Sequence, residues 1–159
     1  GICLWADVIY VTGTVQTLAF IEEEAAGKRG WEFYLTGDEK VRFKTYDGTA
    51  AVYLTKLSNA AMSAGIHHIC ATYTALGGAR RILIYIDGAL DTNADDQTTI
   101  PAYIVQDDDA SKLTIGSDLV NPWDWKSAIG ASFITKGLAP ALATIQRLYE
   151  AGKYYYMPY

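Results

Sequence analysis

Alternating aliphatic residues between positions 66 and 88 constrain the fold of this chain more than any other feature. In an extended strand every second side chain lies on the same face, and two such apolar rows occur here, separated by the glycine-containing segment 74–80. This pattern predicts a β-hairpin, and Asp87-Gly88 predicts a tight turn in which the chain reverses again. The two rows are His67, Ile69, Ala71 and Tyr73, and Ile82, Ile84 and Ile86.

The same alternation recurs along the rest of the chain and predicts an all-β protein. Residues 36–39 separate two alternating segments, so we expect a second hairpin there. Its polar face carries Lys40, Arg42 and Lys44 on one strand and Glu32 on the other, which predicts a side facing solvent. Further strands are predicted over 2–11, 14–21, 50–57, 113–115 and 128–138. The apolar segment 98–106 contains Pro101, so we expect either an edge strand or an irregular crossing there.

Several of these segments resemble the laminin G-like domains of the concanavalin A-like class. Residues 67–73 and 82–88 resemble the paired central strands of these domains, where the pattern WHHVAVTYDG … LYVDG recurs. Residues 2–6 are similar to their ISLWV strand, 112–116 to their LTIG strand and 133–138 to their RIYNRAL segment. The resemblance implies an antiparallel two-sheet jelly roll, a sandwich that hosts lectins, adhesion modules, glycan hydrolases and virion proteins.

The resemblance also implies one domain over residues 1–159 that lacks an upstream strand. The chain enters a strand at Ile2, without the strand that these domains usually have before this point. We therefore expect a neighbouring strand with unpaired backbone groups, which another chain would cover by donating a strand. A structure with all strands paired within the chain would contradict this expectation.

Charge and composition exclude two classes of partner. The chain has 13 Lys and Arg against 18 Asp and Glu, and this net charge of −5 disfavours a phosphate backbone, whose binding needs clustered cations. The basic row Lys40, Arg42 and Lys44 leaves an anionic-glycan or phosphate site as an alternative to a merely solvated face. No segment approaches the ~20 apolar residues of a membrane-spanning helix. We expect a soluble chain that neither binds nucleic acid nor inserts into a membrane.

The cysteines and histidines are predicted to be structural. Cys3 and Cys70 lie inside strand patterns, where free cysteine packs as a small apolar residue, so we expect free thiols, with a disulfide as the alternative. The redox compartment stays open. His67 and His68 are neighbours on one strand and point to opposite faces, so they cannot chelate one metal ion together.

The carboxylates suggest two kinds of site. Glu22 and Glu24 have the alternate spacing that places two carboxylates about 5 Å apart in retaining glycanases, but a glycine-containing charged loop follows, and we expect no enzyme. Two acidic loops are the best candidates for calcium, which prefers several carboxylate and carbonyl oxygens. Exposed turns are the alternative. The candidate ligands are Asp95, Asp96, Asp107 and Asp109.

Trp123, Asp124 and Trp125 form the most distinctive loop. An aromatic ring stacks on the apolar face of a sugar and a carboxylate accepts hydrogen bonds from its hydroxyls, so this triplet is a candidate carbohydrate site. The alternative, which we favour, is that the rings cover the open end of the sandwich or pack on a neighbouring subunit.

After Pro140 the apolar period becomes helical, and Gly152 predicts the end of an amphipathic helix of about three turns. The apolar face consists of Leu142, Ile145, Leu148 and Tyr149. The tyrosine-rich tail is predicted to form either a final strand or a contact surface with another copy, through Tyr154, Tyr155, Tyr156 and Tyr159.

These observations predict a non-enzymatic structural and recognition module, located outside the cell or in a virus particle. We expect it to assemble with other copies of itself or another structural protein, as phage head-decorating and tail-fibre domains of this class do. Binding of a glycan, assisted by calcium, is the alternative. A glycoside hydrolase is the third possibility.

Overall fold

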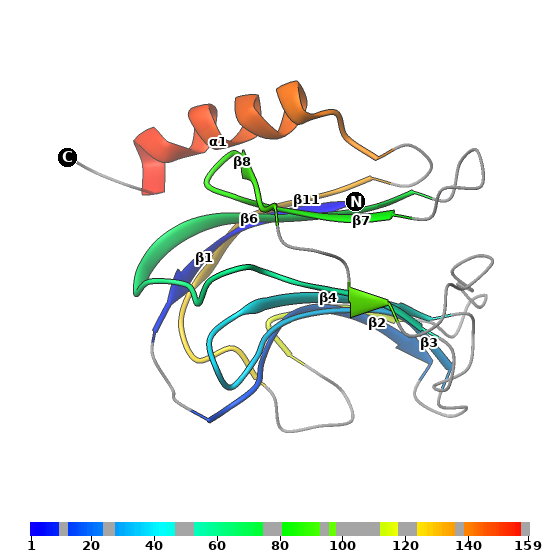
Figure 1. The fold of residues 1–159 in the computed structure, drawn as a ribbon. Coiled ribbons are helices and arrows are strands. Elements are labelled where there is room, and N and C mark those ends of the chain that lie inside the picture. The colour runs from blue at the N-terminus through cyan, green and yellow to red at the C-terminus, as the bar shows by residue number, and fades with distance from the viewer. Residues whose placement is uncertain are drawn as a thin grey trace.

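The computed structural model describes residues 1–9, 13–23, 28–46, 53–74, 81–92, 96–97, 112–117, 124–135 and 139–156. Two antiparallel sheets pack face to face, and one helix lies on the outer face of one sheet (Figure 1). This arrangement confirms the predicted antiparallel sandwich with a C-terminal helix. The elements are β1 (Ile2–Val8), β2 (Gln16–Glu23), β3 (Lys28–Leu35), β4 (Val41–Tyr46), β5 (Tyr53–Leu57), β6 (Gly65–Thr74), β7 (Arg81–Ile86), β8 (Ala89–Leu90), β9 (Asp96–Gln97), β10 (Lys112–Ile115), β11 (Ile129–Ile134) and α1 (Leu142–Tyr156).

The strand order of each sheet follows from a few hairpins. Sheet A has the order β11-β1-β6-β7-β8, and sheet B has the order β10-β2-β3-β4-β5-β9. The central hairpin is β6–β7, as predicted, with Ala71 opposite Ile84 and Tyr73 opposite Ile82. Asp87 and Gly88 have φ values of 52° and 76°, the left-handed conformation that a two-residue hairpin turn requires at both positions. The chain therefore reverses into β8, as predicted.

The main core lies between the two sheets. Sheet A contributes aliphatic side chains to it, and sheet B contributes most of the aromatic rings. The Phe33 and Phe43 rings meet edge to face with their centroids 5.6 Å apart. Each fully buried large apolar side chain stabilises the fold by about 1.5–3 kcal/mol. The buried residues include Ile2, Leu4, Ile69, Ala71, Ile82 and Ile84 from sheet A, and Leu18, Trp31, Phe33, Leu35, Val41 and Phe43 from sheet B.

The outer face of sheet B differs from the solvated face that the sequence predicted. Glu32 points away from the core residues Trp31 and Phe33, yet it is only 5% exposed. It lies opposite Lys44 in the β3–β4 register, and the Lys44 ammonium lies 4.8 Å from the centre of the Tyr46 ring. The predicted exposure of Glu32 is therefore wrong, although the predicted pairing of Glu32 with the basic row is correct.

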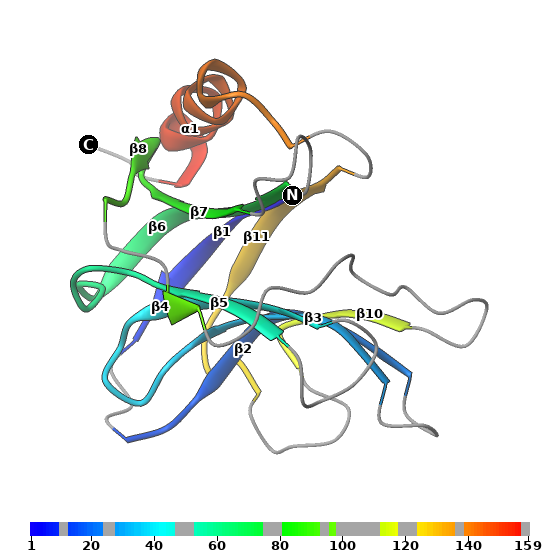
Figure 2. The ribbon, with the colours of Figure 1, turned by 45° about the vertical axis from the view of Figure 1, so that its right-hand side comes forward.

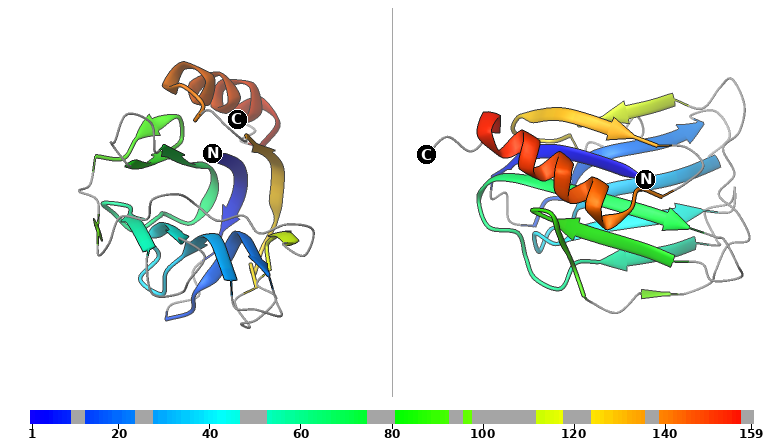
Figure 3. Two further views of the ribbon diagram at one scale, coloured as in Figure 1. Left: turned by 90° about the vertical axis from the view of Figure 1, so that its right-hand side faces the viewer. Right: turned by 90° about the horizontal axis from the view of Figure 1, so that it is seen from above.

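The first strand has a neighbour on each side. β1 pairs with β6 along Ile2–Val8 and with β11 along its other edge. β1 itself is therefore paired on both sides, and the absence of an upstream strand stays a prediction. Within the described residues, β11 pairs only with β1 and β10 pairs only with β2. These two edge strands lie on the same side of the sandwich (Figures 2 and 3).

Helix α1 runs across the outer face of sheet A and extends further than predicted (Figure 3, right). Ile145 is its buried residue, whereas Leu142, expected on the same face, is exposed. Gly152 lies inside the helix, so its predicted role as the end is wrong. A Cβ atom at Gly152 would overlap the indole nitrogen of Trp5. Glycine is therefore needed at this position because helix and sheet approach closely.

No helix in the described part of the chain is long and apolar enough to cross a membrane.

We predict that Gly152→Ala lowers the free energy of unfolding by about 1–2 kcal/mol because the added methyl group overpacks against Trp5. The opposite sign is expected from helix propensity alone, which favours Ala over Gly by about 1 kcal/mol. Denaturant unfolding of the variant measures the change. In a Trp5→Leu background the same substitution should become neutral or stabilising. Equal destabilisation in both backgrounds would contradict the close contact.

Candidate functional site

An aromatic cluster fixes α1 on sheet A. Trp5 on β1 stacks on Tyr149 and Tyr156 of the helix, with centroid distances of 5.7 and 5.2 Å. The His68 ring on β6 lies 5.1 Å from the Trp5 ring. Because neighbouring residues of a strand face opposite sides, Trp5 and His68 point outward to the helix while Leu4 and Ile69 point into the main core.

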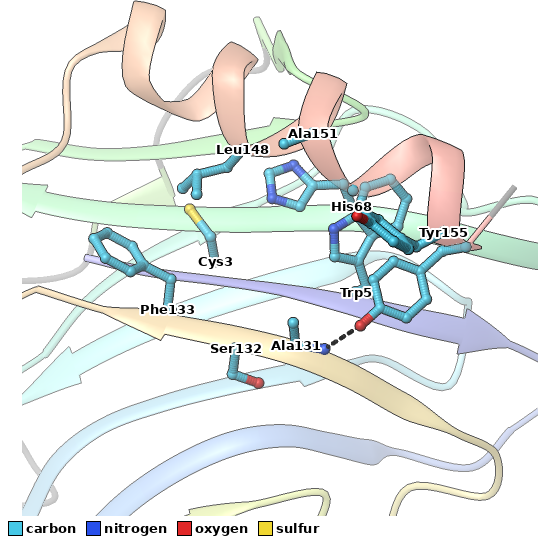
Figure 4. Close-up of a pocket in the computed structure, with 11 residues that line it drawn as sticks. Cys3, Trp5, His68, Ala131, Ser132, Phe133, Leu148, Ala151 and Tyr155 are labelled. Carbon is cyan, nitrogen blue, oxygen red and sulfur yellow. Dashed lines mark hydrogen bonds between the residues drawn. The ribbon is translucent and has the colours of Figure 1, made fainter.

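A mostly apolar cavity of about 390 Å³ lies beside this cluster, between α1 and the outer face of sheet A (Figure 4). The sheet contributes Cys3, Trp5 and His68, the edge strand contributes Phe133, and the helix contributes Leu148 and other side chains. Such a cavity suits an apolar side chain or a small apolar molecule. No sequence pattern predicted this cavity, because its size depends on how closely the helix approaches the sheet. The remaining lining residues are Ala131, Ser132, Ala151, Gly152, Tyr155 and Tyr156.

Cys3 and Cys70 form a disulfide beneath the helix. The expectation of free thiols is therefore wrong, because the β1–β6 register places the two cysteines directly opposite each other on one face. His68 lies two residues before Cys70 on the same face, and its Nε2 atom is 3.7 Å from the Cys70 Sγ atom. Burial lowers the pKa of His68 to about 4, so the imidazole is neutral.

His67 points to the other face, as predicted, and joins the β7–β8 turn to β6. Its Nδ1 atom donates to the Asp87 carboxylate over 2.8 Å, and the other carboxylate oxygen accepts the His68 backbone N–H. The hydrogen bond that His67 donates to Asp87 raises the pKa of His67. Ser63 Oγ lies 3.0 Å from His67 Nε2, which gives the Ser–His–Asp order of serine hydrolases. The carbonyl of Ser63 also lies 3.2 Å from Nε2, so the preceding loop holds the imidazole, and the structural role expected for His67 stays a prediction.

The Trp125 ring of the predicted carbohydrate site Trp123, Asp124 and Trp125 is not accessible to a sugar. Trp125 is only 8% exposed and belongs to the main core, so no ring face is open for stacking. Its indole N–H has no hydrogen-bond partner in the described part of the chain. Asp124 is exposed and accepts a hydrogen bond from Ser117 over 2.8 Å. The burial of Trp125 agrees with the favoured alternative, a ring that covers the open end of the sandwich, whereas Trp123 lies outside the described residues.

The calcium hypothesis rests on residues whose side chains are not described. Asp95, Asp107 and Asp109 lie outside the described residues. Asp96 belongs to β9, where its backbone pairs with Thr55, and its side chain is not described. Calcium at these loops therefore stays a prediction.

The side of the sandwich between β10 and β11 is open, and we call its apolar side chains the open-side surface. Leu113 and Ile115 lie opposite Ile21 and Ala19 of β2, on the inner face of sheet B. Ile134 lies opposite Ile2, on the inner face of sheet A. No further strand covers these core-facing residues at the sheet edges within the described part of the chain, so they remain 41–45% exposed. The surface consists of Leu113, Ile115 and Ile134, whereas Phe133 lies opposite Cys3 on the outer face of sheet A.

Among the residues that the structure describes, no strand pairs with the other edge of the β11 backbone. Gly1 and Thr135 exchange both backbone hydrogen bonds, at 3.0 and 2.9 Å. Because bonded and non-bonded pairs alternate along an antiparallel ladder, the N–H and C=O groups of Ile134 and Ser132 point away from β1. The open edge therefore offers hydrogen bonds as well as apolar side chains.

The predicted assembly tyrosines divide into two groups. Tyr154 and Tyr155 are 63% and 85% exposed and remain candidates. Tyr156 is already engaged within the chain, since it stacks on Trp5 and its hydroxyl accepts the Ala131 N–H over 3.0 Å (dashed in Figure 4). Its ring and hydroxyl are thus already bound within the chain, and a contact of Tyr156 with another copy stays a prediction. Tyr159 lies outside the described residues, and the tail through Tyr156 is helical instead of a strand.

The two histidines should change the pH dependence of the free energy of unfolding in opposite directions. The lowered pKa of His68 costs the folded protein on the order of 3 kcal/mol of stability as the pH falls from 6.5 to about 4, because the folded state resists protonation there. His68→Gln should remove this loss. Protonated His67 stabilises the fold, and this contribution is lost as the pH rises above 6.5 through the raised pKa of His67. His67→Gln should therefore remove the fall of stability in this range. Denaturant unfolding across pH 4–8 measures both. Identical pH profiles for the two variants would contradict these assignments.

The family of the chain follows from comparison with known proteins. Residues 2–131 match the family model Laminin_G_3, described as the Concanavalin A-like lectin/glucanases superfamily. The match spans both sheets and ends within β11, before α1. A comparison with curated protein sequences found no match. Together with the two antiparallel sheets, the match shows that the chain belongs to the concanavalin A-like lectin/glucanase superfamily, as the sequence resemblance implied.

Proposed function

We propose that this domain is a non-enzymatic assembly module that binds a second copy of itself through the open side of its sandwich. The observation that carries the proposal is the open-side surface, where core-facing apolar side chains stay exposed between two strand edges. Monomeric proteins usually avoid such edges because they template pairing with another chain. The superfamily fold supports the module but does not select this function from others.

Strand addition is the mode of binding that fits this surface. The segment Ile129–Ile134 contains no proline and no charged residue, the features that commonly protect an edge strand from pairing. A strand added beside β11 would hydrogen-bond to Ser132 and Ile134. A second copy presents the same edge, so a two-fold axis would bring two β11 strands together antiparallel. Apolar side chains of the added strand would then cover Ile134 and the neighbouring Leu113 and Ile115 of β10.

The disulfide supports a location outside the cell or in a virus particle. Disulfides persist in oxidising surroundings and are rare in the cytosol of most organisms. The Cys3–Cys70 bond joins two central strands of sheet A, so it would stabilise a module exposed to such surroundings.

We predict that Ile134→Lys weakens self-association at least tenfold, because it places an ammonium group where the partner strand would pack. Sedimentation velocity over a concentration series measures the dissociation constant. Leu90→Lys is the matched control, since Leu90 is 39% exposed on β8, at the opposite edge of sheet A. A wild-type protein that stays monomeric, or equal weakening by both variants, would overturn the proposed contact.

The exposed tyrosines provide a second test of the same assembly. Tyr155 lines the cavity together with Phe133 of β11, so a partner seated on β11 would also reach the C-terminal end of α1. We predict that the double variant Tyr154→Ser/Tyr155→Ser weakens association and leaves the unfolding midpoint nearly unchanged. Tyr156→Phe should do the reverse, because its hydroxyl bonds to Ala131 within the chain. Association unaffected by the double variant would remove the tyrosines from the interface.

Carbohydrate binding is the second candidate function. It is favoured by the exposed carboxylate of Asp124, which is available to sugar hydroxyls, and by membership of a superfamily that includes lectins. A glycan array with and without calcium tests it. Binding that is lost in Asp124→Ala but kept in Ile134→Lys would assign recognition to the loop and assembly to the edge.

A further inference from the structure

A cluster of metal-binding donor atoms lies beneath α1. The Sγ atoms of Cys3 and Cys70 and an imidazole nitrogen of His68 all lie within 4.8 Å of one another, and all three residues are buried. The register explains why they meet, since Cys3 lies opposite Cys70 and His68 lies two residues before Cys70 on the same face of β6. From these three residues we infer that the domain, with its disulfide reduced, binds one zinc ion.

The spacing of the donors matches zinc. In a tetrahedral site with Zn–N of about 2.0 Å and Zn–S of about 2.3 Å, a nitrogen and a sulfur ligand lie about 3.6 Å apart. The distance between His68 Nε2 and Cys70 Sγ is 3.7 Å, so this pair is already spaced as two ligands of one ion. The two sulfurs, which are bonded in the oxidised form, must separate to about 3.8 Å, as side-chain rotation after reduction allows.

The surroundings supply a neutral site with an open position. Two thiolates and one neutral imidazole balance the charge of Zn²⁺, so no net charge is left buried beneath the helix. Cys3 and His68 both line the cavity, as Figure 4 shows, so a water molecule from the cavity can take the fourth position. The donor set of two sulfurs and one nitrogen selects a soft or borderline ion such as zinc over calcium or magnesium.

Only the two sulfur atoms change oxidation state when the zinc site forms, and the metal ion does not. The reductant is a dithiol, which is oxidised to its own disulfide, or a phosphine, which takes an oxygen atom from water and becomes the phosphine oxide. It supplies two electrons, two protons come from the dithiol or from water, the Cys3–Cys70 bond breaks, and two thiols form. Each thiol then loses a proton to solvent as it binds Zn²⁺. The disulfide and the zinc ion are therefore mutually exclusive links between β1 and β6, the first under oxidising and the second under reducing conditions.

Cobalt binding to the full chain tests this inference. The protein is reduced with a phosphine, separated from the reductant without air, and titrated with Co²⁺, which reports thiolate ligation by charge-transfer absorption and tetrahedral geometry by its visible bands. We expect one Co²⁺ per chain, displaced by Zn²⁺, and no such absorption from the oxidised protein. Equal absorption from the oxidised protein, or none from the reduced protein, would overturn the inference.

Variants separate ligation from general effects on folding. Cys3→Ser and Cys70→Ser should each abolish the charge-transfer absorption, and His68→Gln should weaken Co²⁺ binding at least tenfold. His67→Gln is the matched control and should bind normally, because its side chain faces Asp87 on the other side of the strand. Far-UV circular dichroism follows folding in parallel. If reduction unfolds the chain, Zn²⁺ should restore the β spectrum in the wild type and not in His68→Gln. Failure to restore it would also overturn the inference.

Discussion

The antiparallel pairing of β1 with β6 positions nearly every feature of this molecule. Its register sends Ile2, Leu4 and Ile69 into the core between the sheets and sends Cys3, Trp5 and His68 outward beneath the helix. Since side chains alternate with a period of two, a shift by one residue would exchange the two sets. The apolar core would then lose its aliphatic layer, and the helix would lose its docking partners. The register is therefore set by burial on both faces of sheet A.

Local patterns predicted the elements whose causes are local. Alternating apolar residues identified the β6–β7 hairpin, and Asp87-Gly88 identified its following turn, because a positive φ at both positions has few chemical solutions. Gly152 is also a glycine, but it is needed for a different reason, the close approach of the helix to Trp5, which is 147 positions away in the sequence. Contacts of this kind depend on the packed structure, so the sequence pattern alone predicted the helix and misplaced its end.

The candidate site was harder to predict than the fold, because exposure at a sheet edge depends on which strands are neighbours. Ile134 and Leu113 follow the same core pattern as fully buried residues, and only the order of the sheets shows that they lie at an open side. Conversely, Trp125 resembles a recognition residue in its loop but is buried. The opposite directions of His67 and His68, which strand geometry alone determines, were predicted correctly.

The helix rests on a second, smaller core that shares no side chain with the core between the sheets. This second core contains Cys3, Cys70, Tyr85 and Ile145, and the main core contains no residue of α1. We therefore expect α1 to open locally at a lower free energy than the sandwich. Undocking of α1 would expose Trp5 and the cystine to solvent while the sandwich stays closed. Amide hydrogens of the helix would then exchange through a lower-energy opening than those of the central strands.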